Sequence, residues 1–250
     1  MHLITDTYLP DYLQQIWSLA TSVDTFLQHT KELSFEYLIE TSSLYSSNIE
    51  GNPLDLNSFM NAKMNSQKPK EFAEIENLIQ AYDFARTHPL NEKNLLHIHL
   101  LLSKTLLDEN QQGKRRNERV WVFGNEGLVY LAIEPQFVAE KMTELFADIA
   151  ELLEKKLSVE ECFYYASYVH LVFAHLHPFP DGNGRSARLL EKWFLTKKLW
   201  PEFRKLEAEK YYKEHRPEYY NNINLWINYY ELNYAKAVPF LLMLPQSLHR

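Results

Sequence analysis

The sequence predicts an all-α, mostly helical fold with one small β-hairpin, and three observations support this. Only six of the 250 residues are glycine, where ordinary usage of about 7% would give roughly 17. Apolar residues recur at helical spacing through most of the chain. A single stretch, 119–132, is instead rich in residues that favour strands. The few glycines mark places where the backbone turns or a ligand comes close.

Helical periodicity predicts the order of the elements. The expected helices cover 11–29, 33–49, 70–87, 92–107, 135–155, 159–176, 184–199, 202–214, 217–232 and 235–243. Pro135 begins one of them, where the missing N–H costs nothing. We expect an N-terminal helical region over 1–69, a core with the hairpin over 70–200, and C-terminal helices over 201–250 that pack on that core.

The expected hairpin joins two short strands. Arg119–Phe123 and Leu128–Ala132 flank the turn sequence Gly124-Asn-Glu-Gly127. A lone hairpin is marginally stable in water and must pack against the rest of the protein. It can serve as a flap over a site, or its free edge can bind a target segment as an added strand.

Composition excludes several classes of protein. Apolar residues make up 46% and charged residues 24% of the chain, which excludes global disorder. The net charge of −7 argues against a nucleic-acid partner, although a local basic site is compatible with it. A single cysteine, Cys162, excludes a disulfide framework and a multi-cysteine zinc site.

Neither a signal-peptide pattern nor an apolar run of about 20 residues is visible. We therefore expect a soluble, cytoplasmic protein without a membrane partner. Self-association into a homo-oligomer is left open.

Most of the candidate functional residues lie in one segment, 177–188, which reads His-Pro-Phe-Pro-Asp-Gly-Asn-Gly-Arg-Ser-Ala-Arg. An apolar helix ends at His177, and Gly182-Asn183-Gly184 opens the next helix. Two glycines at a helix start let successive N–H groups converge on an anion. Arg185 and Arg188 share one face of the first turn, where cations oppose the helix dipole. Such a pair suits an anion with several charges, such as a polyphosphate.

Two further side chains complete this constellation. A carboxylate beside phosphates, here Asp181, commonly holds Mg²⁺. His177 has an unperturbed pKa near ~6.5 and can accept a proton from a hydroxyl nucleophile. The pattern is neither a Walker P-loop nor a Rossmann loop. The alternative is a helix–loop–helix corner with a solvated arginine pair.

The same residues match a family signature. His177 to Arg188 resembles the Fic-domain motif, HxFx[D/E]GNGRxxR, at every defined position, and the resemblance runs from about 70 to about 240. It implies transfer of AMP from ATP to a Ser, Thr or Tyr hydroxyl of a target protein. That target could bind along the 119–132 hairpin.

The resemblance also implies a role for each residue of the motif. His177 would be the general base and Asp181 the Mg²⁺ ligand. Phe179 would point into the core. The phosphate-binding residues would be Gly182, Asn183, Gly184, Arg185 and Arg188, and Tyr220 would contact the nucleotide base from the segment Arg216–Tyr220.

Glu50 ends a predicted helix just before Gly51. A carboxylate there opposes the helix dipole, so a cationic partner would stabilise it. The residues alone leave two other interpretations, a solvated surface glutamate and a poorly placed capping box with Ser47. Ser46 to Gly51 resembles the inhibitory motif of Fic proteins, [S/T]xxxE[G/N]. The resemblance implies that Glu50 pairs with Arg188 and autoinhibits the enzyme in cis.

Other histidines and basic residues have simpler interpretations. His170 and His175 are expected to be buried, hydrogen-bonded residues rather than metal ligands. His97 and His99 cannot share a helix face and look incidental. The run Lys114-Arg-Arg116 is expected to be solvated, with an approach to the nucleotide or target as the alternative.

Three functions are compatible with the sequence. The leading one is a Mg²⁺-dependent protein adenylyltransferase with cis autoinhibition. The second is an enzyme that removes AMP or transfers another nucleotide such as UMP, since the motif sets phosphate geometry and not the base. The third is a module that binds ATP without turnover, against which the intact His177 argues.

Overall fold

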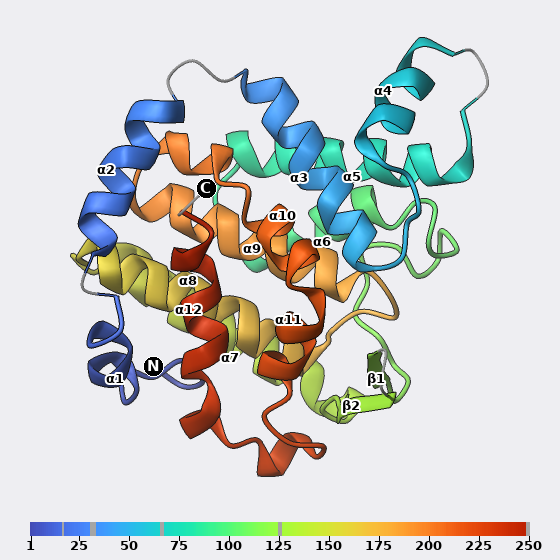
Figure 1. Ribbon diagram of the computed structural model, residues 1–250. Coiled ribbons are helices and arrows are strands. Elements are labelled where there is room, and N and C mark those ends of the chain that lie inside the picture. Colours follow the sequence, from blue (N-terminus) through green and yellow to red (C-terminus); the bar gives the residue numbers. More distant parts are fainter. Residues whose placement is uncertain (17, 31–33, 66–67, 125–126, 249–250) are drawn as a thin grey trace.

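The computed structural model describes residues 1–16, 18–30, 34–65, 68–124 and 127–248. Two central helices, α8 (Val159–Leu176) and α9 (Asn183–Lys198), pack against each other and are surrounded by the remaining helices (Figure 1). Every residue of α8 from Cys162 to Leu176 is buried. The Ser158 and Glu161 side chains form a capping box at its start, which fixes where the helix begins.

The N-terminal part of the chain lies along one side of this pair. It consists of α1 (Leu9–Leu13), α2 (Leu19–His29), α3 (Phe35–Ile49) and α4 (Leu56–Met64). Helix α3 packs on α5 (Lys70–Thr87), α9 and α10 (Ala208–Glu214). Its last turn is thereby held next to the first turn of α9.

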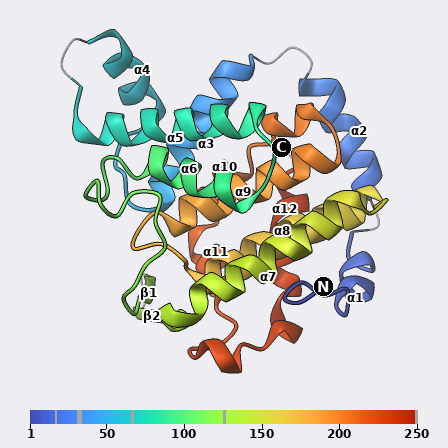
Figure 2. The same ribbon diagram turned by 180° about the vertical axis from the view of Figure 1, so that it is seen from behind.

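The middle of the chain contributes the far side and the hairpin. Seen from behind, α5, α6 (Glu92–Leu102) and α7 (Pro135–Glu154) cover the central pair (Figure 2). Strands β1 (Trp121–Gly124) and β2 (Gly127–Leu131) pair antiparallel, with a bulge between Val122 and Phe123. Asn125 and Glu126, the centre of the expected turn, lie outside the described residues.

The C-terminal part returns across α8. It includes α11 (Arg216–Ile223), α12 (Val238–Gln246) and three 3₁₀ turns at Pro201–Lys205, Tyr229–Glu231 and Tyr234–Lys236. The hairpin packs against this part, because Leu131 N–H donates to the Ile227 carbonyl at 2.6 Å. No helix among the described ranges combines the length and apolarity needed to cross a membrane.

The expected helical fold with one hairpin is confirmed, and several expected boundaries are wrong. The helix expected over 11–29 is divided into α1 and α2. The buried side chains at 12, 16, 19 and 23 keep helical spacing across the break, so periodicity cannot detect it. Helix α6 ends at Leu102 and α11 ends at Ile223, both earlier than expected. The division into three regions stays a prediction.

Helix α4 is absent from the expected elements. Asp55 caps it by accepting the Ser58 N–H at 2.7 Å. Its apolar side packs into a small separate cluster with Phe59 stacked on Phe72 at 5.0 Å. The helix is short, and the polar residues around it hide this pattern in the sequence.

Candidate functional site

The centre of the site is the junction between α8 and α9. His177 follows the last turn of α8 with φ 47° and ψ 59°, and it is the one described non-glycine residue with positive φ. Its half-buried side chain lines a cleft of about 260 Å³ together with Asp181, Gly184 and Glu50. Three residues of the signature therefore face one cavity, as the sequence leads us to expect.

The contacts of His177 indicate which of its two ring nitrogens carries the proton. Nδ1 lies 3.3 Å from the Ala174 carbonyl and 3.3 Å from the Tyr130 hydroxyl, which itself donates to Ala174 at 2.5 Å. Both neighbours are thus acceptors for an Nδ1–H, which leaves Nε2 as the acceptor atom of the ring. Burial lowers the pKa of His177 to about 4, and the charge of Arg116 acts in the same direction. The imidazole is therefore neutral at pH 7.

The loop after His177 is held by side chains that point inward. Phe179 is fully buried, as expected. The Asn183 side chain accepts the Phe179 N–H and donates to the Phe179 carbonyl, both at 2.8 Å. Asn183 can therefore offer its backbone N–H to an anion, whereas its amide is engaged in shaping the loop.

His99 anchors this loop, so the expectation that it is incidental is wrong. Its ring stacks on Phe179 at 3.7 Å, its Nδ1 accepts the Gly113 N–H at 3.0 Å, and its Nε2 donates to the Asp181 carbonyl at 2.9 Å. Burial lowers its pKa to about 4, which keeps this arrangement neutral. Its spacing from His97 carries no signal of such a role.

Asp181 faces the cleft with an exposed side chain. Within the described ranges no three His, Cys, Asp or Glu side chains gather into a metal-binding group. Mg²⁺ in nucleotide sites takes one or two carboxylates and completes its shell with phosphate oxygens and water. Asp181 thus fits a metal shared with a bound phosphate better than a metal held by protein alone.

The first turn of α9 is shaped for an anion. Gly182 precedes it with φ 78°, and a Cβ there would lie 2.8 Å from Cδ1 of Leu102. A Cβ on Gly184 would lie 2.2 Å from Oε1 of Glu50, so the carboxylate lies directly against the helix backbone. The first N–H groups of a helix have no intrahelical partner, and the helix dipole favours negative charge there.

Arg188 makes the predicted contact with Glu50. Nη2 lies 2.7 Å from Oε1 of Glu50, and Nε donates to the Ser46 hydroxyl at 2.9 Å. Nη2 also donates to the Ser46 carbonyl at 3.0 Å, and Nη1 donates to the Tyr219 hydroxyl at 3.3 Å. The arginine is 1% exposed, whereas 26% of the Glu50 side chain is exposed.

The proximity of Glu50 and Arg188 shifts the pKa values of both side chains. Burial opposes the charged form of each residue, but the opposite charge outweighs it, so the pKa of Glu50 is lowered and that of Arg188 is raised.

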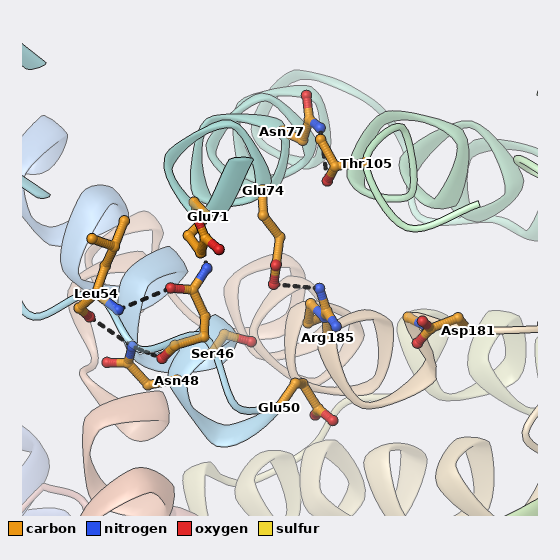
Figure 3. A network of polar contacts seen from close by, with 12 residues as sticks. Ser46, Asn48, Glu50, Leu54, Glu71, Glu74, Asn77, Thr105, Asp181 and Arg185 are labelled. Carbon is orange, nitrogen blue, oxygen red and sulfur yellow. Dashed lines mark hydrogen bonds and ion pairs between the residues drawn. The ribbon is translucent and has the colours of Figure 1, made fainter. Parts of the chain in front are cut away.

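Arg185 has a different carboxylate partner, Glu74 of α5, at 2.5 Å (Figure 3). The figure shows Arg185 between Glu74 and Asp181. Nε of Arg185 is buried and has no hydrogen-bond partner within the described residues. One edge of the guanidinium is thus held by Glu74, which the sequence analysis does not identify.

Residues behind Arg188 extend the polar contacts into the core. The Tyr219 hydroxyl lies 3.0 Å from Nε2 of His170, whose Nδ1 lies 3.2 Å from a carboxylate oxygen of Glu191. His175 contacts the Ile223 carbonyl at 2.8 Å. Both histidines are buried and bound to protein groups, as expected.

The end of α3 is fixed by a set of amide contacts (Figure 3). Asn48 donates to the carbonyls of Asn52 and Leu54, each at 2.8 Å, and Asn52 donates to the Glu71 carbonyl at 2.9 Å. Gly51 turns the chain with φ 100°. The position of Glu50 is therefore set by backbone on both sides of it.

The opposite wall of the cleft combines the hairpin with α11. Trp121 and Val122 line it from β1, and Tyr219 and Tyr220 line it from α11. The guanidinium of Arg216 lies over the Tyr220 ring at 5.1 Å. The structure thus places Tyr220 at the same cleft as His177.

Several known proteins resemble this chain in sequence. The model of the Fic/DOC family matches residues 89–195. Over 50 residues the chain is 44% identical to "Protein adenylyltransferase Fic" of Drosophila persimilis, covering 19% of this chain and 10% of that protein. It is 27% identical over 197 residues to the protein of that name in Culex quinquefasciatus, covering 72% of this chain and 35% of the relative.

Solved structures show the same fold. A Fic family protein from Desulfovibrio desulfuricans G20 superposes with a TM-score of 0.79 at 22% identity, covering 99% of this chain and 74% of that one. A Fic-domain signaling protein from Bacteroides thetaiotaomicron superposes with a TM-score of 0.73 at 18% identity, covering 92% of both chains. Residues 89–195 thus match the Fic/DOC family model and contain the complete signature, and the chain shares its fold with solved Fic-domain proteins.

Proposed function

We propose that this protein transfers AMP from ATP to a Ser, Thr or Tyr hydroxyl of a target protein, and that Glu50 restrains the transfer. The observation that carries the proposal is the cleft shared by His177, Asp181 and Gly184 at the start of α9. The names of the curated relatives support the same activity. The chain spans about a third or less of the length of those relatives.

The chemistry follows from the positions of the side chains. The target hydroxyl oxygen bonds to the α-phosphorus while the bond from that phosphorus to the β-phosphate oxygen breaks, and pyrophosphate leaves. The neutral His177 accepts the hydroxyl proton on Nε2, while its Nδ1–H is directed to Ala174 and Tyr130. The first N–H groups of α9 and the charge of Arg188 stabilise the phosphate charge that develops.

Asp181 is the residue that would hold Mg²⁺. The ion would neutralise phosphate charge when bound. We expect Asp181→Asn to raise the Mg²⁺ concentration needed for half-maximal transfer by roughly tenfold or more, measured by titrating Mg²⁺ at saturating ATP. An unchanged Mg²⁺ dependence would remove Asp181 from this role.

Glu50 restrains the reaction because its carboxylate occupies an anion position. It lies against Gly184 and is paired with Arg188, and both groups would otherwise be available to a terminal phosphate. A nucleotide can bind productively only when the carboxylate moves or is removed. Ser46 supports this state by holding Arg188 at two points.

The hairpin is the part of the protein that would bind the target. The side of β2 away from β1 is occupied at Leu131, which bridges to Asn228 in parallel and donates to the Ile227 carbonyl. Within the part of the chain that the structure describes, the sheet contains only β1 and β2, so the outer side of β1 is free to pair with an extended target segment.

Labelling from α-labelled ATP tests the proposal. The Glu50→Gly variant should label itself or proteins of an added extract more than the parent does, and Glu50→Gly/His177→Ala should label neither. Offering all four nucleoside triphosphates identifies the nucleotide transferred. ATP binding by Glu50→Gly without any label in protein would instead indicate a binding module.

A further inference from the structure

Arg116 lies just before the hairpin and is 4% exposed, in contrast to the solvated basic run expected from the sequence. Among the described residues, its guanidinium donates to backbone carbonyls alone. Nε donates to His177 at 2.6 Å and Nη1 to Glu118 at 2.7 Å. Nη2 donates to Leu176 at 3.3 Å and also to Ile133. Four carbonyls from three segments thus meet on one side chain.

No ion pair of the described residues includes Arg116. A buried charge without a carboxylate is costly unless hydrogen bonds replace the lost water, and here four carbonyls do so. Burial lowers the pKa of Arg116. The neighbouring Arg115 is different: it lies nearer the surface and pairs with Glu92. The arginine at 116 is therefore suited to joining backbone segments rather than to pairing with an acid.

The joined segments are the two ends of the hairpin and the end of α8. Glu118 precedes β1 and Ile133 follows β2, whereas Leu176 and His177 end α8. The backbone N–H of Arg116 adds a bond to the Pro178 carbonyl at 2.8 Å. The last carbonyls of a helix have no intrahelical partner, and the guanidinium satisfies two of them. His177 also has left-handed backbone angles, which its surroundings must hold.

We propose that Arg116 is a positioning residue that fixes the hairpin relative to His177, so that a hydroxyl presented on β1 meets the imidazole. This proposal rests on the proposed function. The residues that line the cleft do not include Arg116 among those described, so its role in transfer is separate from nucleotide binding. A small displacement of His177 from the target hydroxyl is enough to slow a reaction that depends on their relative position.

The kinetic test uses the active Glu50→Gly background. We expect Arg116→Lys and Arg116→Met to lower kcat for labelling by about tenfold or more while the Kd for ATP changes by less than about twofold. Arg115→Lys and Arg115→Met are the matched controls and should leave both values unchanged. An unchanged kcat, or equal losses in kcat and ATP affinity, would overturn the proposal.

Hydrogen exchange provides a readout that does not need activity. In Arg116→Lys, peptides covering 118–124 and 127–133 should exchange faster, whereas the buried part of α8 should stay as protected as in the parent. Unchanged exchange in the hairpin would overturn the proposal, and so would general loss of protection in α8. If Glu50→Gly labels no protein, the proposed function fails, and hydrogen exchange still decides whether Arg116 holds the hairpin.

Discussion

Oε1 of Glu50 lies 2.7 Å from Nη2 of Arg188, although 138 positions separate the two residues in the chain. The same oxygen lies against the backbone of Gly184. One carboxylate therefore contacts both groups that an anionic ligand would use at the start of α9. Under the proposed function, this carboxylate would compete with a nucleotide phosphate for both groups.

Gly184→Ala tests the close approach of this carboxylate. The backbone at Gly184 is helical, where alanine is ordinarily more stable than glycine by about 1 kcal/mol. In the parent, however, the new Cβ would displace Glu50 from Arg188. The new Cβ would also lie 3.1 Å from Nη1 of Arg188, a contact that remains when Glu50 is absent. We therefore expect the substitution to destabilise the parent more than the Glu50→Gly variant, as measured by urea unfolding. The same effect in both backgrounds would show that the carboxylate does not lie there.

Ser46→Ala tests the hydrogen bond to Arg188. The bond joins a buried hydroxyl to a charged group, and its loss should lower the free energy of unfolding by about 1.5–3 kcal/mol. Ser47→Ala is the matched control, because the buried Ser47 hydroxyl has no hydrogen-bond partner among the described residues. Removal of the Ser47 hydroxyl should leave the free energy of unfolding nearly unchanged. Equal losses for the two variants would contradict the contact.

Two fully buried histidines predict the dependence of stability on pH. Burial lowers the pKa of His99 and of His175 from 6.5 to about 4. Between pH 4 and pH 6.5, these two histidines are therefore protonated in the unfolded chain and neutral in the folded chain. Each histidine contributes stability that is fully present above pH 6.5. This contribution is lost as the pH falls from 6.5 to about 4, and the free energy of unfolding decreases by about 1.4 kcal/mol per pH unit in that window.

His175→Gln should make the unfolding free energy less dependent on pH between about 6.5 and 4. Replacing His29, which is exposed, is the control and should leave the slope as in the parent. Urea titrations at several pH values measure both. A slope that stays the same in His175→Gln would refute the effect of burial on this residue.

Much of the site could be predicted from the sequence because its residues are close together in the chain. The signature places His177, Asp181 and the start of α9 within one local turn, and local chemistry indicates an anion site there. Glu50 could be connected to Arg188 only through the resemblance, because no local pattern links two distant helices.

The remaining residues depend on tertiary packing. Nothing in the spacing of Arg116 or Glu74 shows that the first joins four carbonyls and the second holds Arg185. The break between α1 and α2 is hidden because apolar spacing continues through it. Helix α11 also ends at Ile223, although the tyrosine-rich sequence after it continues to favour a helix.

Binding of ATP and AMP to the parent and to Glu50→Gln tests the central claim most directly, with Glu36→Gln on the same helix as the control. If Glu50 occupies the place of the terminal phosphates, Glu50→Gln should bind ATP about tenfold or more tightly than the parent and bind AMP with unchanged affinity. An unchanged affinity for ATP, or an equal gain for AMP, would contradict the account.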